Sequence, residues 1–356
     1  MIKNARIHSR GTWPREYYQQ PSRGNPEYVV SPSVLKLFGK SPRKWKAGVE
    51  TPESESLEYG SLLDTRLLTP AQFGERYAIQ PATYKTIILR CPKCGSITKA
   101  ATCRDCKTER ERHEVTNEWS DQSHTCQQWT KDQEAAGKEI AWQSQLADTD
   151  AAIKRLMDEP AISTFLRESE KQVWVKAEWH DTNGLVIPIQ CLIDLVPTKD
   201  SEFCKCIGDV KSTRDGDLKA FGRDIFKFGH YIQAAFNLDM ISAALPDEDR
   251  MQFCLILSER KSPFEPGLRA ISNNRDSSED GYYNAGHEDY QTLLRFYCHC
   301  LQTGTWPGYE YKDPFAVQGW SYPRMENWMN FERPTFTPPK DQGQDDAPPD
   351  DGEIGA

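Results

Sequence analysis

The sequence predicts an α/β protein in which helices cover a sheet. Two apolar runs, residues 187–196 and 203–210, are separated by a polar turn, which is typical of paired strands. A third strand is predicted at residues 172–179, where apolar residues alternate, and the Asp-Thr-Asn-Gly turn after it indicates a hairpin. Residues 226–245 are apolar on most sides, which favours a helix buried against that sheet.

Further elements are predicted along the chain. Ser31 and Pro32 provide the cap and first turn of a helix that ends near Ser41. A second helix at residues 57–68 carries Asp64, either at the edge of a buried face or on the surface. The remaining predicted elements are helices at 117–136, 148–166 and 290–301 and a strand at 253–257.

Composition excludes a membrane-spanning class. The chain has 356 residues, 37% of them hydrophobic, and a mean hydropathy of −0.73. No run approaches the ~20 apolar residues that cross a bilayer. The first residues carry charge without the apolar segment of a secretory signal, so we expect a cytoplasmic protein.

Charge is distributed unevenly. The net charge of −9 argues against a nucleic-acid partner, but −5 of it lies in residues 335–356. This Pro-, Asp- and Gly-rich end predicts a disordered acidic tail at 334–356. Residues 85–112 hold eight Lys or Arg against three acidic residues, a local net charge of +5. These residues form either an arm that contacts DNA or a purely structural zinc module whose lysines only keep it solvated.

Cysteine spacing predicts a zinc site. Eleven cysteines in a chain without a recognisable signal peptide favour thiols and metal over disulfides. Two CxxC pairs, separated by eight residues, have the spacing of a zinc ribbon; they are Cys91, Cys94, Cys103 and Cys106. Redox pairs are the alternative for these four. Buried thiols are expected for the other seven, and an iron–sulfur cluster that includes Cys126, Cys298 and Cys300 is a less favoured interpretation.

Two carboxylates end the paired apolar runs. Asp194 and Asp209 are flanked by apolar residues, and Lys211 shares a strand face with Asp209 because strand side chains alternate. Buried carboxylates need partners, and oxygen ligands suit a hard divalent cation. The residues therefore predict either a metal site for phosphodiester cleavage or a structural Asp–Lys pair at a strand end.

The order of these motifs resembles the PD-(D/E)XK nuclease superfamily, and within it the RecE-type exodeoxyribonucleases of phages and prophages. The resemblance covers roughly residues 30–330. It is carried by the Ser-Pro-Ser opening, the GSLLDTRLLTP helix at 60–70, the Trp…Gly-Lys segment at 129–140, Asp194, the DVKST strand at 209–213, the HYIQAAF helix at 230–236 and the GTWPGY motif at 304–309.

The resemblance implies a restriction-endonuclease-like core with a central mixed sheet flanked by helices. It implies an N-terminal extension at 1–29 and a nuclease domain at 30–333, which the zinc ribbon predicted from cysteine spacing interrupts at 85–113. It also implies site roles: Asp64, Asp194 and Asp209 hold Mg²⁺ or Mn²⁺ with the carbonyl of Val210, Lys211 assists the attacking water, and Gln233 places a phosphate or the lysine. Three features depart from the family: Asp64 stands where many relatives have histidine, Asn237 where a tyrosine often follows, and the ribbon is unusual.

The function implied is Mg²⁺-dependent digestion of double-stranded DNA from an end, as phage-type recombination by single-strand annealing requires. The expected partners are DNA ends and a single-strand annealing protein. Ring-shaped oligomers occur among such exonucleases, although the sequence itself carries no sign of one. Two alternatives stay open: a RecB- or Cas4-like nuclease of different polarity or structure preference, and a non-catalytic DNA-binding protein with a degenerate core and a zinc arm.

Overall fold

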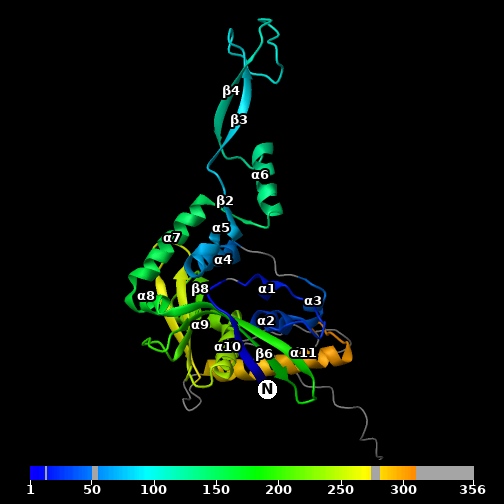
Figure 1. The fold of residues 1–356 in the computed structure, drawn as a ribbon, viewed down its shortest axis with the longest axis vertical. Helices are drawn as coiled ribbons and strands as arrows, with labels where there is room; N and C mark the ends of the chain where they lie inside the picture. The colour runs from blue at the N-terminus through cyan, green and yellow to red at the C-terminus, as the bar shows by residue number, and fades with distance from the viewer. Residues whose placement is uncertain (13, 50–54, 274–280, 310–356) are drawn as a thin grey trace, which may run out of the picture.

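The computed structural model describes residues 1–12, 14–49, 55–273 and 281–309 (Figure 1). The predicted acidic tail, 334–356, lies outside these ranges. The strands are β1 (Ile2–Ser9), β2 (Tyr77–Ile79), β3 (Thr83–Arg90), β4 (Glu111–Glu118), β5 (Glu139–Ala141), β6 (Ser169–His180), β7 (Val186–Pro197), β8 (Cys206–Thr213), β9 (Gln252–Glu259) and β10 (Pro266–Ser272). The helices are α1 (Arg15–Tyr18), α2 (Pro32–Lys40), α3 (Pro42–Lys46), α4 (Glu55–Leu68), η1 (Pro70–Gln72), α5 (Phe73–Arg76), α6 (His124–Ala135), α7 (Gln143–Asp158), α8 (Pro160–Arg167), α9 (Leu218–Lys227), α10 (His230–Ala244) and α11 (Gly281–Thr303).

The centre of the fold is a six-stranded mixed sheet in the order β1-β6-β7-β8-β9-β10. Only β8 and β9 run parallel; the other neighbouring pairs in this sheet are antiparallel. Alternate residues of β9 enter two hydrophobic clusters, with Leu255 and Leu257 in one and Ile256 in the other. Since strand side chains alternate, these clusters lie on opposite faces. The predicted mixed sheet flanked by helices is therefore confirmed.

Each face is covered by its own helices. The larger cluster joins the sheet to α2, α10 and α11, and the smaller one joins it to α4, α7 and α8. α10 has buried residues on all sides, as its apolar sequence predicts. Asp181 and Gly184 form the turn between β6 and β7, and the φ of Gly184 is +82°, so the predicted hairpin is confirmed.

The structure differs from the sequence prediction at several elements. β1, within the predicted extension at 1–29, pairs with β6 and so belongs to the central sheet. The predicted long helix at 226–245 begins instead at His230, because Gly229 has a φ of +65° and separates α10 from α9. The helix predicted at 117–136 starts at His124, since its first residues end strand β4. Pro160 divides the helix predicted at 148–166 into α7 and α8, and β10 was not predicted.

A two-stranded arm, formed by β3 and β4 with the cysteine segment between them, projects from the body (Figure 1). It corresponds to the predicted insertion at 85–113, extended by a few strand residues on each side. At its base β2 pairs with β5, and a small cluster joins Tyr77 and Ala141 to Leu62 of α4. The arm is thus rooted on the helix that carries Asp64.

Gly286 is required where α10 and α11 cross. A Cβ at this position would overlap the carbonyl oxygen of Tyr231 and lie 3.0 Å from the Cβ of Ala235. Gly286→Ala should lower the free energy of unfolding by roughly 1–3 kcal/mol, because backbone must move to admit the methyl group. Gly281→Ala, in the same helix and with no described residue within 4 Å of its Cβ, is the matched control. Urea unfolding of both variants tests this, and equal stabilities would contradict the tight crossing.

Candidate active site and metal centres

A cavity of about 400 Å³ opens where strands β7 and β8 separate. The two strands are paired at Leu195 and Gly208, and the register is not continued along them. The residues predicted to act together line this cavity: Asp64, Asp194, Asp209, Lys211 and Gln233. Asp64 belongs to α4 and Gln233 to α10, which cover opposite faces of the sheet. They meet because the separated strands leave an opening through it.

The segment before α2 occupies part of this opening. Val30 forms a parallel bridge with Ile189, and its N–H donates to the carbonyl of Pro188 at 3.0 Å. Gln190 and Leu192 alternate with Asp194 along β7, so all three face the cavity. The opening is therefore bordered by β7 and Val30 on one side and by β8 on the other.

Asp194 is fixed by two hydrogen bonds, one across the opening from β8 and one from the neighbouring strand β6. The backbone N–H of Val210 donates to its Oδ2 at 3.0 Å, and Nε2 of Gln172 donates to its Oδ1 at 3.0 Å. A strand residue presents its N–H and C=O to the same edge, so the carbonyl of Val210 also faces this opening. The Asp194 carboxylate therefore accepts the hydrogen bond that the backbone of a neighbouring strand would otherwise accept from Val210.

Asp209 is 3% exposed and is held from two sides. Nε2 of Gln233 donates to its Oδ1 at 2.7 Å, and the ammonium of Lys211 forms an ion pair with its Oδ2. That Oδ2 makes no hydrogen bond of regular geometry within the described residues. Lys36 extends from α2 and donates to Oε1 of Gln233 at 3.4 Å. Gln233 therefore links the carboxylate to a second lysine.

Burial and mutual repulsion set the charges in the cavity. Burial, and then the negative charge of Asp209, raise the pKa of Asp194 to about 7. Burial, and then the charge of Asp194, raise the pKa of Asp64 well above its usual value. Burial opposes the charge of Lys211, but the surrounding carboxylates outweigh it and raise the pKa of this lysine. For Lys36, burial and the charge of Lys211 lower the pKa to about 8.

This donor set suits a hard divalent cation. Asp64, Asp194 and Asp209 line one cavity, and Oδ2 of Asp209 is buried in an ion pair with Lys211. Burial, and then mutual repulsion, raise the pKa of Asp64 and Asp194, and a Mg²⁺ or Mn²⁺ ion would offset this repulsion. Among the described residues, the oxygens of these three carboxylates do not lie as close together as the cysteine sulfurs described next.

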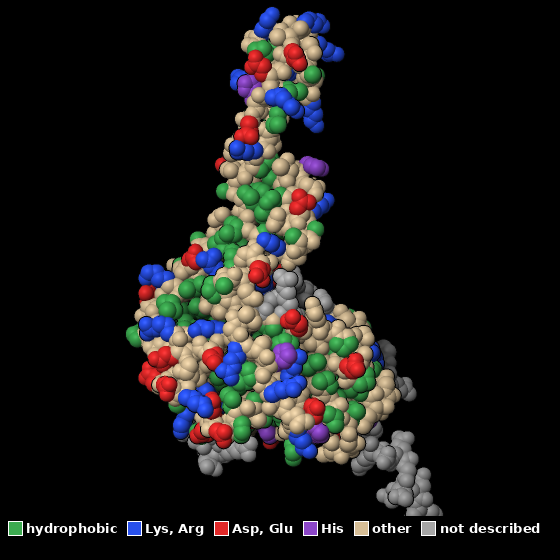
Figure 2. All heavy atoms as spheres, viewed as in Figure 1, with side chains coloured by type: hydrophobic (Ala, Val, Ile, Leu, Met, Phe, Trp, Pro, Cys, Tyr) green, Lys and Arg blue, Asp and Glu red, His purple; other side chains and the backbone are tan. Residues whose placement is uncertain are grey.

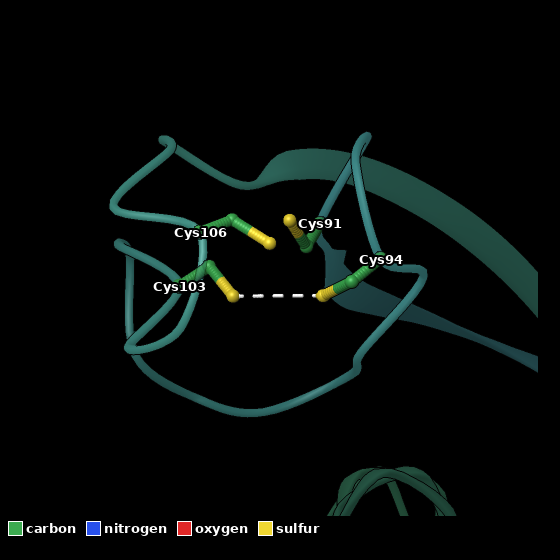
Figure 3. A group of neighbouring side chains, drawn as sticks. All are labelled: Cys91, Cys94, Cys103 and Cys106. Atoms are coloured by element: carbon green, nitrogen blue, oxygen red, sulfur yellow. Dashed lines mark hydrogen bonds between the residues drawn. The ribbon is translucent and has the colours of Figure 1, made fainter.

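The four predicted cysteines form the tip of the arm, and their sulfurs face one another (Figure 3). All four sulfurs lie within 4.8 Å of one another, the one group of this kind within the described residues. The two CxxC turns are alike: Gly95 donates its N–H to Cys91, and Lys107 donates to Cys103, both at 2.9 Å. Both Gly95 and Lys107 have a left-handed φ. This arrangement fits a tetrahedral zinc site, whereas the alternative with Cys126, Cys298 and Cys300 brings no such group together.

Sequence reasoning missed several groups around the cavity. Lys36 and Gln172 were not singled out, because each lies far in sequence from the residue that it contacts. His230 is half-buried near both lysines, and burial together with their charges lowers its pKa. Its only sequence signal was its place in the helix of Gln233. Tyr17 and Tyr18, which also line the cavity, fell within the predicted extension.

Comparisons with known proteins add little to this description. No protein family profile and no curated protein matches the chain. A solved structure of a candidate exonuclease from Eubacterium rectale is similar over 84% of this chain and 90% of its own, with 14% identity and a TM-score of 0.45. Rai1 of Scheffersomyces stipitis is similar over 79% of this chain and 70% of its own, with 9% identity and a TM-score of 0.19. Neither score establishes a shared fold.

Within the described residues, no helix is long and apolar enough to cross a membrane.

The pKa of Asp194 predicts a pH-dependent stability in metal-free protein. Because the folded-state pKa is raised from 3.8 to about 7, folding favours the protonated form. The associated stabilisation is complete below about pH 4 and is lost as the pH rises through 7. Asp194→Asn should therefore gain stability relative to the wild type as the pH rises, with a slope of at most about 1.4 kcal/mol per pH unit.

Urea unfolding in EDTA at pH 5, 6, 7 and 8 measures this difference. Asp200→Asn, which changes an exposed carboxylate in the turn before β8, is the matched control. A constant difference between Asp194→Asn and the wild type across these pH values would contradict the raised pKa.

The arm should hold one zinc ion per chain that resists mild EDTA treatment, because four thiolates bind zinc far more tightly than carboxylates do. Replacing Cys103 and Cys106 together by serine should release the zinc and loosen the arm. The melting transition of the body should persist, since β3 and β4 contact mainly each other and α6. Metal analysis and circular dichroism test this, with Cys204→Ser as the control that keeps its zinc. A preparation without zinc, or with the visible absorption of an iron–sulfur cluster, would refute the assignment.

Proposed function

We propose that this protein is a metal-dependent deoxyribonuclease with a PD-(D/E)XK-type core, and that it resects linear double-stranded DNA as an exonuclease. One observation carries the proposal: Asp64, Asp194, Asp209 and Lys211 line a single cavity although they come from three separate elements. A structural Asp–Lys pair would not explain three carboxylates, one buried and two half-buried, in the lining of one cavity. Metal-dependent phosphodiester hydrolysis commonly uses carboxylates that hold a divalent cation, with a lysine beside them.

The proposed roles follow from the geometry. Asp64, Asp194 and Asp209 would hold Mg²⁺ or Mn²⁺ with the carbonyl of Val210, and the ion would supply Lewis acidity and an activated water when bound. Lys211 stays charged because the carboxylates raise its pKa, so its ammonium can orient the nucleophile and balance developing negative charge. Gln233 positions Asp209 through a 2.7 Å hydrogen bond.

We propose further that the arm binds the phosphate backbone of the same DNA. Figure 2 shows Lys and Arg side chains around its tip. Arg110 is buried and donates to the carbonyls of Ala100 and Thr102, so it stabilises the tip itself. Exposed cations lie at the tip, namely Lys93, Lys99, Arg104 and Lys107, and along the two strands, namely Lys85, Arg90 and Arg112. A local charge of +5 on an acidic chain favours a polyanionic partner.

The wider biological setting belongs to the same proposal. An exonuclease of this type would leave single-stranded DNA for an annealing protein, as in phage recombination, and would act in the cytoplasm. A ring-shaped oligomer would be one way to retain the DNA. These points rest on the motif resemblance, whereas the chemistry above rests on the arrangement of the cavity.

The test uses end-labelled linear and closed circular DNA, each with Mg²⁺ or with EDTA. We expect degradation of linear DNA with Mg²⁺ only, and a loss of at least about 100-fold in Asp209→Ala and Lys211→Ala, because each removes a group that acts on the reacting phosphate. Asp200→Ala, an exposed carboxylate outside the cavity, should keep full activity.

The outcomes separate the alternatives. Cleavage of closed circles would favour an endonuclease. Wild-type turnover by Asp209→Ala would refute the metal assignment, and DNA binding without cleavage by the wild type would favour the non-catalytic alternative.

A further inference from the structure

The cavity has a second wall that the proposed chemistry does not use. Besides the charged residues, its lining includes Tyr17, Tyr18 and Tyr28, together with the apolar side chains of Val29 and Leu192. The aromatic residues come from the first 28 residues, outside the motifs on which the resemblance depends. One cavity thus combines an aromatic wall with a charged wall.

Tyr17 anchors this aromatic wall. Its ring lies edge-on to Trp174 of β6, with 5.7 Å between centroids, and its carbonyl accepts from Nε2 of Gln190 at 3.1 Å. Gln190 in turn accepts from Nε1 of Trp174 at 3.0 Å. Nε2 of Gln20 donates to the same Tyr17 carbonyl at 2.9 Å. Helix α1 is therefore held on the sheet through side chains that are themselves hydrogen-bonded.

Tyr18 is presented differently from its neighbour. Its side chain is 56% exposed, although it lines the cavity, and its ring lies edge-on to Tyr17 with 5.0 Å between centroids. An exposed aromatic ring on an anchored segment offers a flat surface at little cost in side-chain entropy, because a tyrosine has few rotatable bonds. Tyr18 thus contributes an exposed aromatic ring to the cavity lining.

The two walls match the two parts of a nucleotide. The phosphate is anionic and suits a cation with Lys211, whereas the base has a flat π-face that stacks on aromatic side chains. A volume of about 400 Å³ lies within the ~300–1,000 Å³ of small-molecule sites. Duplex DNA is much wider, since its major groove alone is about 12 Å across. The cavity therefore has room for a single unpaired nucleotide.

We propose that Tyr18 is a stacking platform for the base of the unpaired nucleotide at a DNA end, while the phosphate of that nucleotide faces Asp209 and Lys211. This inference rests on the proposed nuclease function and specifies its substrate. The terminal base must leave its pair to reach Tyr18, so the enzyme should prefer frayed or single-nucleotide overhanging ends to fully paired ends. Tyr18 is then a binding and specificity residue, and it takes no part in proton transfer.

The experiment compares Tyr18→Ala and Tyr18→Phe with the wild type on linear DNA that ends in a normal or an abasic nucleotide. Stacking contributes through the ring alone, so Tyr18→Phe should behave as the wild type. Tyr18→Ala should raise KM by roughly 5- to 150-fold on normal ends, with kcat less affected. On abasic ends Tyr18→Ala and the wild type should be equal. Trp142→Ala, which removes a similarly exposed aromatic ring outside the cavity, is the control.

A fluorescence measurement separates this inference from the nuclease function. In EDTA, without cleavage, a terminal 2-aminopurine should be quenched on binding to the wild type and Tyr18→Phe but not to Tyr18→Ala. Quenching by a wild type that does not cleave DNA would support the platform while refuting the nuclease. Cleavage with equal KM values for Tyr18→Ala and the wild type would refute the platform alone. Equal losses on normal and abasic ends would also refute it, since they would indicate a structural role.

Discussion

The gathering of three carboxylates around one lysine is the constraint on which the rest of the structure depends. Asp209 is buried and Asp64 and Asp194 are half-buried beside it, so their negative charges repel one another and need partners. Lys211 supplies positive charge, and the backbone of β8 and the amide of Gln233 supply hydrogen bonds. Without a bound cation, the repulsion among these carboxylates lowers the stability of the protein. We therefore propose that the site serves cation binding and catalysis.

The scaffold meets this constraint by interrupting its own sheet. Where β7 leaves β8, the N–H of Val210 would have no strand partner, and the Asp194 carboxylate takes that position. The same interruption admits Asp64 from one face and Gln233 from the other, and Val30 borders the gap. The site and the break in the sheet are therefore one feature, and a regular β7–β8 ladder would leave no room for it.

The sequence predicts what depends on local pattern. Alternation along a strand places Asp209 beside Lys211, and CxxC spacing brings four sulfurs together, since both follow from backbone geometry over a few residues. Lys36 and the role of the first residues could not be predicted in this way. Their positions depend on how α2 and α1 pack on strands and helices far along the chain, and β1 likewise has no pattern that identifies its partner β6. The motif resemblance supplied Asp64 and Gln233, which local pattern alone left ambiguous.

The arm and the cavity differ in the sequence separation between the residues that are in contact. Cys94 and Cys103, which touch at the arm tip, are 9 residues apart, whereas Lys36 and Gln233 are separated by 197. Short loops close at much lower entropic cost than long ones, so local contacts form first. During synthesis from the N-terminus, the arm is complete once β4 has emerged, but the cavity must wait for α10. The order of synthesis therefore brings the four sulfurs of the arm together before the carboxylate cavity is assembled.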